Sequence, residues 1–295
     1  MSKILLLGGT SDGRKLAARL HKAGFQVIYS VAGLVRMPEL DCEVISGGFN
    51  RFAPERVLDK EEQNPSVSGL VSFLKTQQVA LILDVTHPYA VNMSTHAVQA
   101  AEAEQIPCWR FHRPAWEMQE GDRWSSFVDW HEMLQQLRSR QGGVLLTTGQ
   151  LTQSELDQLM DAVNQSAVKT TELSHGKVSQ GSRDKSEPEP EPLRIVMRTA
   201  APSRVKLPEE IHWIKAIGPF DAGNEKALLE EHRIQVIVSK NSGGKATQGK
   251  LDAARALGIE VFMLQRPELP EATRSFSDPD QVFAELISRT QSGSL

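Results

Sequence analysis

The chain has 295 residues, which is enough for two domains of ordinary size, each with its own core. Its 24% charged and 40% hydrophobic residues are typical of a globular protein, and no apolar run approaches the ~20 residues that a membrane span needs. The net charge of -4 argues against a general nucleic-acid binder, and two cysteines without metal-ligand spacing argue against a disulfide framework.

The first residues predict a strand rather than a targeting signal. Residues 1–8 contain an apolar run that is too short for a signal peptide and lacks a cleavage site. We therefore expect a cytoplasmic protein, with no membrane partner.

The first third of the chain alternates short apolar strands with helices. The expected strands are Lys3–Gly8, Gln26–Ser30, Glu43–Ser46, Ala80–Asp84 and Pro107–Phe111, and the expected helices are Asp12–Ala23, Val67–Gln77 and Val91–Glu104. This alternation predicts βαβ units and a parallel sheet. The first and fourth strands should then be neighbours at the switch point, so the loop after Gly8 and the segment after Asp84 should face one crevice.

A second alternating set follows a pause near residue 117. Its expected strands are Gly143–Thr148, Arg194–Arg198, His212–Ile217, Gln235–Lys240 and Glu260–Leu264, and its expected helices are Asp129–Arg140, Ser154–Val163, Asp221–His232 and Gly249–Leu257. The predicted fold class is α/β, with two doubly wound, mainly parallel, Rossmann-like domains facing a cleft, at 1–117 and 118–295. Residues 174–192 are rich in Glu and Pro and poor in apolar side chains, so we expect a disordered insertion there.

A glycine loop follows the first strand and opens a helix. The segment Gly8-Gly9-Thr10-Ser11-Asp12-Gly13 places backbone N–H groups where a phosphate would meet the positive end of a helix dipole. The spacing is not the full G-x-G-x-x-G, so a plain strand-to-helix turn stays open as the alternative.

The end of the second strand bears on the choice of cofactor. Dinucleotide folds that select NAD carry an acidic residue there, whereas this chain has Ser30, with Arg36 shortly after it. A hydroxyl and a cation suit a 2′-phosphate and favour NADPH, with NADH still possible. The alternative is that both residues are solvated loop positions.

Four polar side chains follow the buried strand that ends at Leu83. They are Asp84, Thr86, His87 and Tyr89. Ligands of open α/β sheets bind at the carboxyl ends of strands, and a histidine there can hold or donate a proton near neutral pH. The alternative is that Asp84 and Thr86 cap the next helix and that His87 is merely exposed.

Further polar groups gather at other strand ends. Arg113 could pair with a carboxylate, and Trp116 could form a flat wall or belong to the core. In the second half, Lys240-Asn241-Ser242-Gly243-Gly244 resembles an anion cradle, although a simple turn has the same composition. There is no Walker A or H-E-x-x-H motif, and the G-x-S-x-G spacing occurs only inside the glycine loop, at Gly9–Gly13. We regard hydrolase and metalloenzyme functions as disfavoured and expect no metal.

Seven segments together resemble one family, the precorrin-6A reductases of cobalamin biosynthesis. The segments are Leu5–Thr10, Asp84–Ala90, Arg113–Trp116, Leu145–Gly149, Gly218–Phe220, Val238–Gly244 and Gln265–Pro267. The D-x-T-H-P-Y-A and K-x-S-G-G segments are the specific ones. The chain departs from the family in its insertion and in Val85, where the family often has alanine.

The resemblance implies reduction of one double bond of precorrin-6A, or its cobalt form, by a reduced nicotinamide. The hypothetical cofactor residues are Gly8, Gly9, Thr10, Ser11, Gly13, Ser30 and Arg36. The hypothetical catalytic residues are Thr86, His87 and Tyr89. The hypothetical substrate-binding residues are Asp84, Arg113, Thr148, Gly149, Gly218, Phe220, Lys240, Ser242 and Gly243. The only partner expected is the tetrapyrrole, with no nucleic acid.

Two other functions stay open at this point. One is a non-catalytic NADP-binding sensor or scaffold module. The other is a sugar-nucleotide reductase or epimerase, which the absence of a lysine four residues after Tyr29 or Tyr89 disfavours.

Overall fold

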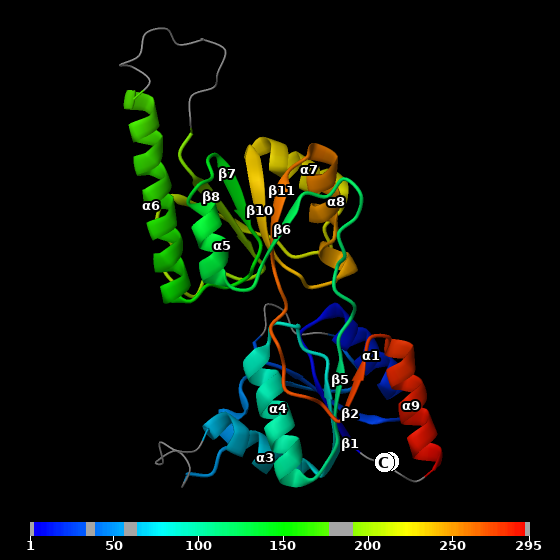
Figure 1. Ribbon diagram of the computed structural model, residues 1–295. Helices are drawn as coiled ribbons and strands as arrows, with labels where there is room; N and C mark the ends of the chain where they lie inside the picture. Colours follow the sequence, from blue (N-terminus) through cyan, green and yellow to red (C-terminus); the bar gives the residue numbers. More distant parts are fainter. Residues whose placement is uncertain (1–2, 34–38, 56–63, 177–190, 293–295) are drawn as a thin grey trace. The chain divides into compact units, whose positions relative to one another are not determined.

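The computed structural model describes residues 3–33, 39–55, 64–176 and 191–292, and the chain forms two compact units. Unit 1 comprises Met1–Pro114 and Pro267–Leu295, and unit 2 comprises Ala115–Arg266. Each unit has one six-stranded sheet in which all strand pairs are parallel, with helices packed against it (Figure 1). The predicted α/β class with two doubly wound sheets is therefore confirmed.

Unit 1 contains the elements of the first alternating set and two more from the end of the chain. They are β1 (Lys3–Leu7), α1 (Ser11–Lys22), β2 (Gln26–Val31), β3 (Glu43–Ser46), the short 3-10 helix η1 (Phe49–Phe52), α3 (Pro65–Gln77), β4 (Val79–Asp84), α4 (Val91–Glu104), β5 (Cys108–Phe111), β12 (Arg274–Phe276) and α9 (Pro279–Gln291). The strand order is β12-β5-β4-β1-β2-β3. Strand β1 pairs with β2 on one side and with β4 on the other, which confirms that the first and fourth strands are neighbours at the switch point.

Side chains of β1 alternate between the two faces of this sheet and so build two core layers. Ile4 and Leu6 pack with α1 and α9, whereas Leu5 and Leu7 pack with α3 and α4. A buried parallel strand contacts helices on both faces, which explains why β1 reads as a continuous apolar run. The switch point is thereby fixed inside a rigid core.

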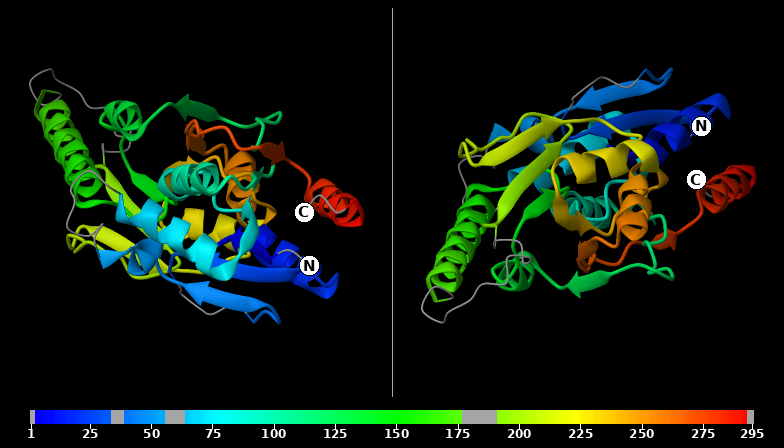
Figure 2. Two further views of the ribbon diagram at one scale, coloured as in Figure 1. Left: turned by 90° about the horizontal axis from the view of Figure 1, so that it is seen from below. Right: turned by 90° about the horizontal axis from the view of Figure 1, so that it is seen from above.

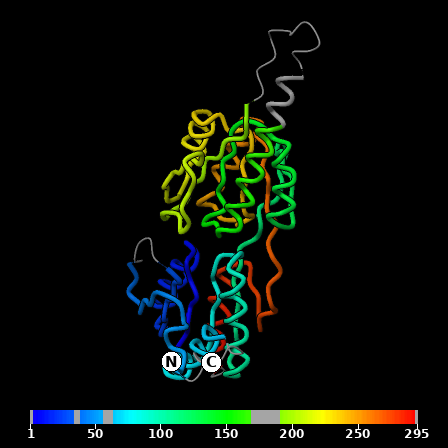
Figure 3. Tube along the Cα trace, turned by 90° about the vertical axis from the view of Figure 1, so that its left-hand side faces the viewer, coloured from blue at the N-terminus to red at the C-terminus, as the bar shows by residue number. Residues whose placement is uncertain are grey.

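The last segment of the chain returns to unit 1. Strand β12 pairs with β5, and α9 lies beside α1, where the guanidinium of Arg19 stacks 4.0 Å from the ring of Phe283 (Figure 2). The tube in Figure 3 traces this red segment back to the unit that holds the blue strands. The predicted division at 117 and 118 therefore differs from the structure, because Pro267–Leu295 packs with the first unit.

Unit 2 repeats the strand order of unit 1. Its elements are β6 (Trp124–Phe127), α5 (Trp130–Leu137), β7 (Gly143–Leu146), α6 (Gln153–Gly176), β8 (Arg194–Thr199), β9 (Ile211–Lys215), α7 (Ala222–Glu231), β10 (Ile234–Lys240), the short 3-10 helix η2 (Lys245–Thr247), α8 (Gly249–Leu257) and β11 (Glu260–Leu264). The order β6-β11-β10-β7-β8-β9 places β7 and β10 at the switch point, as β1 and β4 are in unit 1.

Strands β6 and β12, helix α9 and the end of helix α6 were not predicted. Strands β6 and β12 are too short, and too mixed in polarity, to give a strand pattern, and α9 lies in the segment expected to end the second domain. Helix α6 extends to Gly176, beyond the predicted end at Val163 and into the expected insertion at 174–192. Residues 177–190 of that insertion lie outside the described residues. No helix in the described ranges is long and apolar enough to cross a membrane.

A buried ion pair joins α7 to the sheet of unit 2. Arg198 on β8 binds both carboxylate oxygens of Glu225, one of them at 2.9 Å, and both residues are buried. We expect Glu225→Gln to lower the free energy of unfolding by about 3–5 kcal/mol, because the guanidinium would stay buried without its counter-charge.

The matched control is Glu230→Gln in the same helix, which removes an exposed pair with Lys226 and should cost about 1 kcal/mol or less. Urea unfolding of the two variants measures both values. If both variants lose the same small amount of unfolding free energy, the buried pair has no stabilising role.

Candidate functional site

The glycine loop of unit 1 is shaped by Tyr29 on the neighbouring strand β2. The Tyr29 side chain is buried, and its hydroxyl accepts the Gly9 N–H at 3.0 Å. A Cβ at Gly8 would overlap the Tyr29 ring, so glycine is required there for close packing. Burial is also the main cause that raises the pKa of Tyr29 above its usual value of 10.0.

The same loop leaves room above Gly9. This residue has φ +111°, and no heavy atom lies within 4 Å of the position that a Cβ would take. Thr10 caps α1 by accepting the Gly13 N–H at 3.0 Å, and its hydroxyl donates to the Val85 carbonyl at 3.1 Å. An open backbone at a helix N-terminus fits a diphosphate, with Thr10 contributing through its backbone because its hydroxyl is committed elsewhere.

Asp84 is the centre of a buried polar network at the end of β4. Its side chain is 0% exposed, and its oxygens accept from the Thr86 N–H at 3.1 Å, the Thr86 hydroxyl at 2.7 Å, the Ser94 hydroxyl at 2.7 Å and Arg110 Nε at 3.1 Å. The sequence-based assignment of Asp84 to substrate binding therefore does not fit this structure. Asp84 instead holds Thr86, α4 and β5 in place. Neither Asp84 nor Thr86 caps α4, whose N-cap is Ala90.

His87 and Tyr89 form a half-buried aromatic pair just beyond this network. Their ring centroids are 5.5 Å apart, and His87 Nδ1 accepts the Tyr89 N–H at 3.3 Å. A neutral His87 that accepts at Nδ1 carries its proton on Nε2. These two residues, and not Asp84, therefore offer ionisable groups outside the saturated network.

The glycine loop and the Asp84 segment meet at one small cleft of unit 1. The cleft holds about 10 Å³ and is lined by residues from the carboxyl ends of β1, β4 and β5: Thr10, Asp12, Val85, Thr86, Pro88, Phe111, His112 and Arg113. Arg113 forms an ion pair with Asp12 in the first turn of α1, so the carboxylate that it binds here belongs to the protein. Ser30 is buried at the end of β2, and Arg36 lies outside the described residues.

In unit 2 the predicted loops after β7 and β10 emerge side by side. The Thr147 N–H donates to the Val238 carbonyl at 2.9 Å, which ties the Thr148–Gly149 turn to the strand that leads to Lys240. Thr148 is buried, and its hydroxyl has no hydrogen-bond partner among the described residues. Ser242 is buried, and its N–H donates to the Lys240 carbonyl at 2.8 Å. The Thr148 hydroxyl and Lys240 therefore lie on neighbouring loops, at the carboxyl ends of β7 and β10.

Two aromatic residues frame these loops. The side chain of Asn241 accepts the Trp116 N–H at 2.8 Å and donates to the Trp116 carbonyl at 3.0 Å, which anchors Trp116 to the loop. Phe220 lies under the Arg198 guanidinium at 4.1 Å from its ring centroid, and its N–H donates to the Ala246 carbonyl at 2.9 Å. Gly218 and Phe220 therefore lie against the same segment that follows Gly243.

The main cation of this site escaped sequence analysis. Lys250 in α8 is only 4% exposed, donates to the Thr147 hydroxyl at 3.1 Å, and has its ammonium 5.4 Å from the Trp116 ring centroid. Burial, helped by the Arg198 charge and opposed by Glu225, lowers the pKa of Lys250 to about 7. Burial likewise lowers the pKa of Lys240, and Glu155 opposes that shift.

Known proteins match this chain over nearly its whole length. A family model described as precorrin-6x reductase CbiJ/CobK matches residues 3–176 and 177–286. The precorrin-6A reductase of Rhodococcus erythropolis is 34% identical over 283 residues, covering 94% of each chain. That of Mycobacterium tuberculosis (strain H37Rv) is 30% identical, covering 92% of this chain and 91% of the relative.

A solved structure agrees with these matches. The structure titled CobK precorrin-6A reductase superposes with a TM-score of 0.76 at 27% identity, covering 98% of this chain and 97% of the other. The chain belongs to the precorrin-6x reductase family. The resemblance drawn from the motifs is thereby confirmed.

Two polar residues of this family member carried sequence signals that were overlooked. Arg110 interrupts the apolar run Cys108–Phe111, and a charge inside a buried strand requires a partner, here Asp84. Lys250 lies on the apolar face of its helix with Ala253 and Ala254, where a lysine is unusual. In the part of the chain that the structure describes, no three His, Cys, Asp or Glu side chains are grouped to hold a metal.

The lowered pKa of Lys250 predicts that the free energy of unfolding depends on pH. Between pH 7 and 10.5 the unfolded chain holds a proton on this lysine that the folded chain lacks, so the free energy of unfolding should rise with pH. The rise is at most about 1.4 kcal/mol per pH unit from this group.

Urea unfolding of the wild type and of Lys250→Met at pH 7, 8 and 9 isolates the contribution of Lys250 from those of other titrating groups. The wild type should gain stability relative to the variant as the pH rises. If the free energies of unfolding of the wild type and of Lys250→Met change equally with pH, Lys250 keeps an ordinary pKa in the folded protein.

Proposed function

We propose that this chain reduces one double bond of the precorrin-6A macrocycle to give the 6B product, with NADPH as the preferred reductant. The observation that carries the proposal is the family membership over nearly the whole chain, joined to two doubly wound units with polar groups at both switch points. Both relatives named above are called precorrin-6A reductase, which favours the cobalt-free ring.

The nicotinamide cofactor belongs at the glycine loop of unit 1. The space above Gly9 and the N-terminus of α1 at Ser11 suit its diphosphate. The N–H groups of Gly9 and Gly13 are bonded to the Tyr29 and Thr10 hydroxyls, so these two glycines contribute room for a close approach. The preference for NADPH over NADH rests on Arg36 and on the absence of an acidic side chain from the end of β2, at Ser30. When bound, a reduced nicotinamide supplies the hydride.

His87 and Tyr89 are the residues that this chain offers for handling the proton. The Thr86 hydroxyl donates to Asp84, so it orients the segment and remains able to accept a hydrogen bond. A proton on His87 Nε2, or the Tyr89 hydroxyl, would then serve the carbon next to the one that is reduced. Orientation of the reacting groups supplies the larger share of the rate, up to about 7–11 kcal/mol.

Unit 2 supplies groups suited to the carboxylates at the rim of the ring. Lys240 provides charge, the Thr148 hydroxyl can donate, and Gly243 provides a backbone donor. Ser242 contributes through its side chain, because its N–H is bonded to the Lys240 carbonyl. Gly149, Gly218 and Phe220 complete this surface. In unit 1, Arg113 could bind a carboxylate of the substrate only by sharing or leaving Asp12.

The direct test is to incubate the protein with precorrin-6A and either NADPH or NADH. We expect loss of the cofactor absorbance in step with a change in the tetrapyrrole spectrum, faster with NADPH. The cobalt form of the substrate is tested in parallel. A sensor module or a sugar-nucleotide enzyme would leave the cofactor unoxidised in every combination, and that result would rule out this function.

The part played by His87 has its own test. We expect His87→Ala to lower turnover at least about tenfold while the Kd for NADPH stays nearly unchanged, since proton transfer is lost but the glycine loop is intact.

His131→Ala, which removes a histidine of unit 2 bonded to Gln135 at the surface, is the control and should behave as the wild type. Steady-state kinetics and fluorescence titration of the cofactor measure the two quantities. Wild-type turnover of His87→Ala would leave Tyr89 as the proton donor or place the proton on water.

A further inference from the structure

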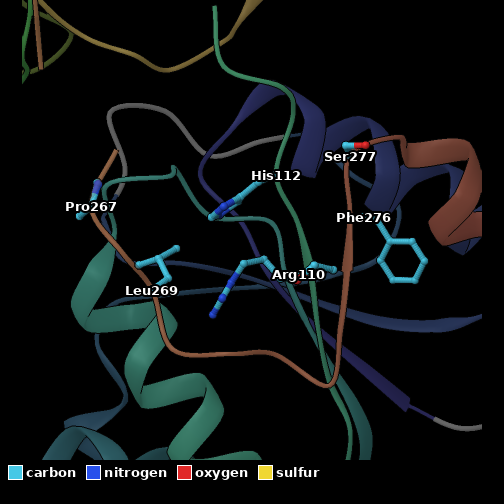
Figure 4. Close-up of a pocket in the computed structure, with 7 residues that line it drawn as sticks. Arg110, His112, Pro267, Leu269, Phe276 and Ser277 are labelled. Carbon is cyan, nitrogen blue, oxygen red and sulfur yellow. The ribbon is translucent and has the colours of Figure 1, made fainter. Parts of the chain in front are cut away.

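A groove of about 450 Å³ lies on unit 1 between β5, β12 and the segment that leads into β12 (Figure 4), and it shares His112 with the small cleft at the glycine loop. Its polar lining consists of Arg110, His112, Ser275 and Ser277, and its apolar lining includes Leu269 and Phe276. None of the functions proposed above uses this groove.

The topology explains why the groove exists. Successive parallel strands of a doubly wound sheet are usually joined by a crossover helix that covers one face of the sheet. Here the chain leaves after β5, builds all of unit 2, and returns through residues 265–273, which contain neither helix nor strand. On the face of the sheet that carries Cys108 and Arg110, α4 packs against β5. Toward β12 that face is covered by an extended segment, tied to β5 by the bond from Cys108 N–H to the Thr273 hydroxyl.

A buried guanidinium lies at the base of this groove. Arg110 is 6% exposed; its Nε donates to Asp84 at 3.1 Å and its Nη1 donates to the Pro270 carbonyl at 2.6 Å. Its Nη2 is buried and has no hydrogen-bond partner among the described residues. Asp84 already accepts from Thr86 and Ser94, so it cannot turn to Nη2 without breaking those bonds. A buried donor left this way costs about 1–3 kcal/mol, which an acceptor oxygen would recover.

The Ser275 hydroxyl of β12 lies on the same face of the sheet as this guanidinium. Ser275 is the register partner of Arg110 in the parallel pair β5 and β12, so both side chains project from the same face of the sheet. Ser277 follows at the end of β12, and Figure 4 shows Arg110 and His112 between the Pro267–Leu269 segment and β12. Arg110 and Leu269 thus face one space, whereas the Phe276 ring turns away from it and packs against Trp109 in the core.

We propose that this groove binds a carboxylate carried on a short apolar stem. Arg110 is already balanced by Asp84, and no lysine lines the groove, so a doubly charged phosphate would be poorly neutralised. A single carboxylate would accept from the Arg110 guanidinium and from the Ser275 hydroxyl beside it, and its stem suits Pro267 and Leu269. The carboxylate is either one arm of the macrocyclic substrate, which rests on the proposed function, or a separate small organic acid.

Propionate is the probe, because it has this chemistry and does not depend on turnover. In an NMR titration of the full chain we expect saturable millimolar binding, with inorganic phosphate binding at least about tenfold more weakly. Ser275→Tyr should fill the groove and weaken propionate at least about tenfold. Tyrosine is favourable in strands, so this variant should keep its fold.

The matched control is Ser126→Tyr, an exposed serine of β6, the edge strand of the sheet in unit 2. It should bind propionate as the wild type does. A wild type that shows no saturable binding, or a Ser275→Tyr variant that binds equally well, would overturn the proposal.

Kinetics with precorrin-6A then identify the source of the carboxylate. If it is an arm of the macrocycle, Ser275→Tyr raises KM at least about tenfold while kcat changes by about twofold or less. If it is a separate acid, KM stays at the wild-type value although propionate binding is lost. A chain inactive with every cofactor would refute the proposed function and leave the propionate titration as a valid test of the groove.

Discussion

The buried carboxylate of Asp84 is the interaction on which the rest of unit 1 depends. Removing a carboxylate from water is costly unless hydrogen bonds replace its hydration, and here four donors do so. The donors come from the segment after β4, from α4 and from β5, so one charge fixes three elements at the switch point. Through Arg110 the same network reaches the returning segment at Pro270. The residues expected to act in catalysis therefore stand on a rigid support rather than on a free loop.

Each sheet receives its sixth strand from a segment that follows the other sheet in the chain. Strand β6 follows the first five strands of unit 1 but pairs with β11, and β12 follows unit 2 but pairs with β5. Both units then have the same strand order, with β1 and β4 corresponding to β7 and β10. The return of β12 to unit 1 has a structural consequence, because an extended segment, and not a crossover helix, leads into β12. The groove at Arg110 follows from this arrangement.

The two switch points differ in chemistry in a way that fits their proposed partners. In unit 1, Tyr29 supports a glycine loop whose backbone is open at Gly9, which suits a diphosphate. In unit 2, the loops carry Lys240 and Thr148, a cation and a hydroxyl donor that suit carboxylates. Lys250, whose pKa is lowered to about 7, is bonded to the neighbouring Thr147. Arg198 and Glu225, whose charges both act on Lys250, balance each other in a buried pair.

The sequence by itself determined the class of fold, the switch-point pairing of the first and fourth strands, and the family, because apolar periodicity and loop motifs are local properties. Tertiary structure alone decided what the polar residues do. The place of Asp84 at the end of a strand predicts that it binds a ligand. In the structure its carboxylate accepts hydrogen bonds from Ser94 and Arg110, which are distant in sequence. The return of Pro267–Leu295 to unit 1 and the burial of Lys250 could not be predicted from the sequence either. Short edge strands and charged side chains acquire their partners only when the chain folds.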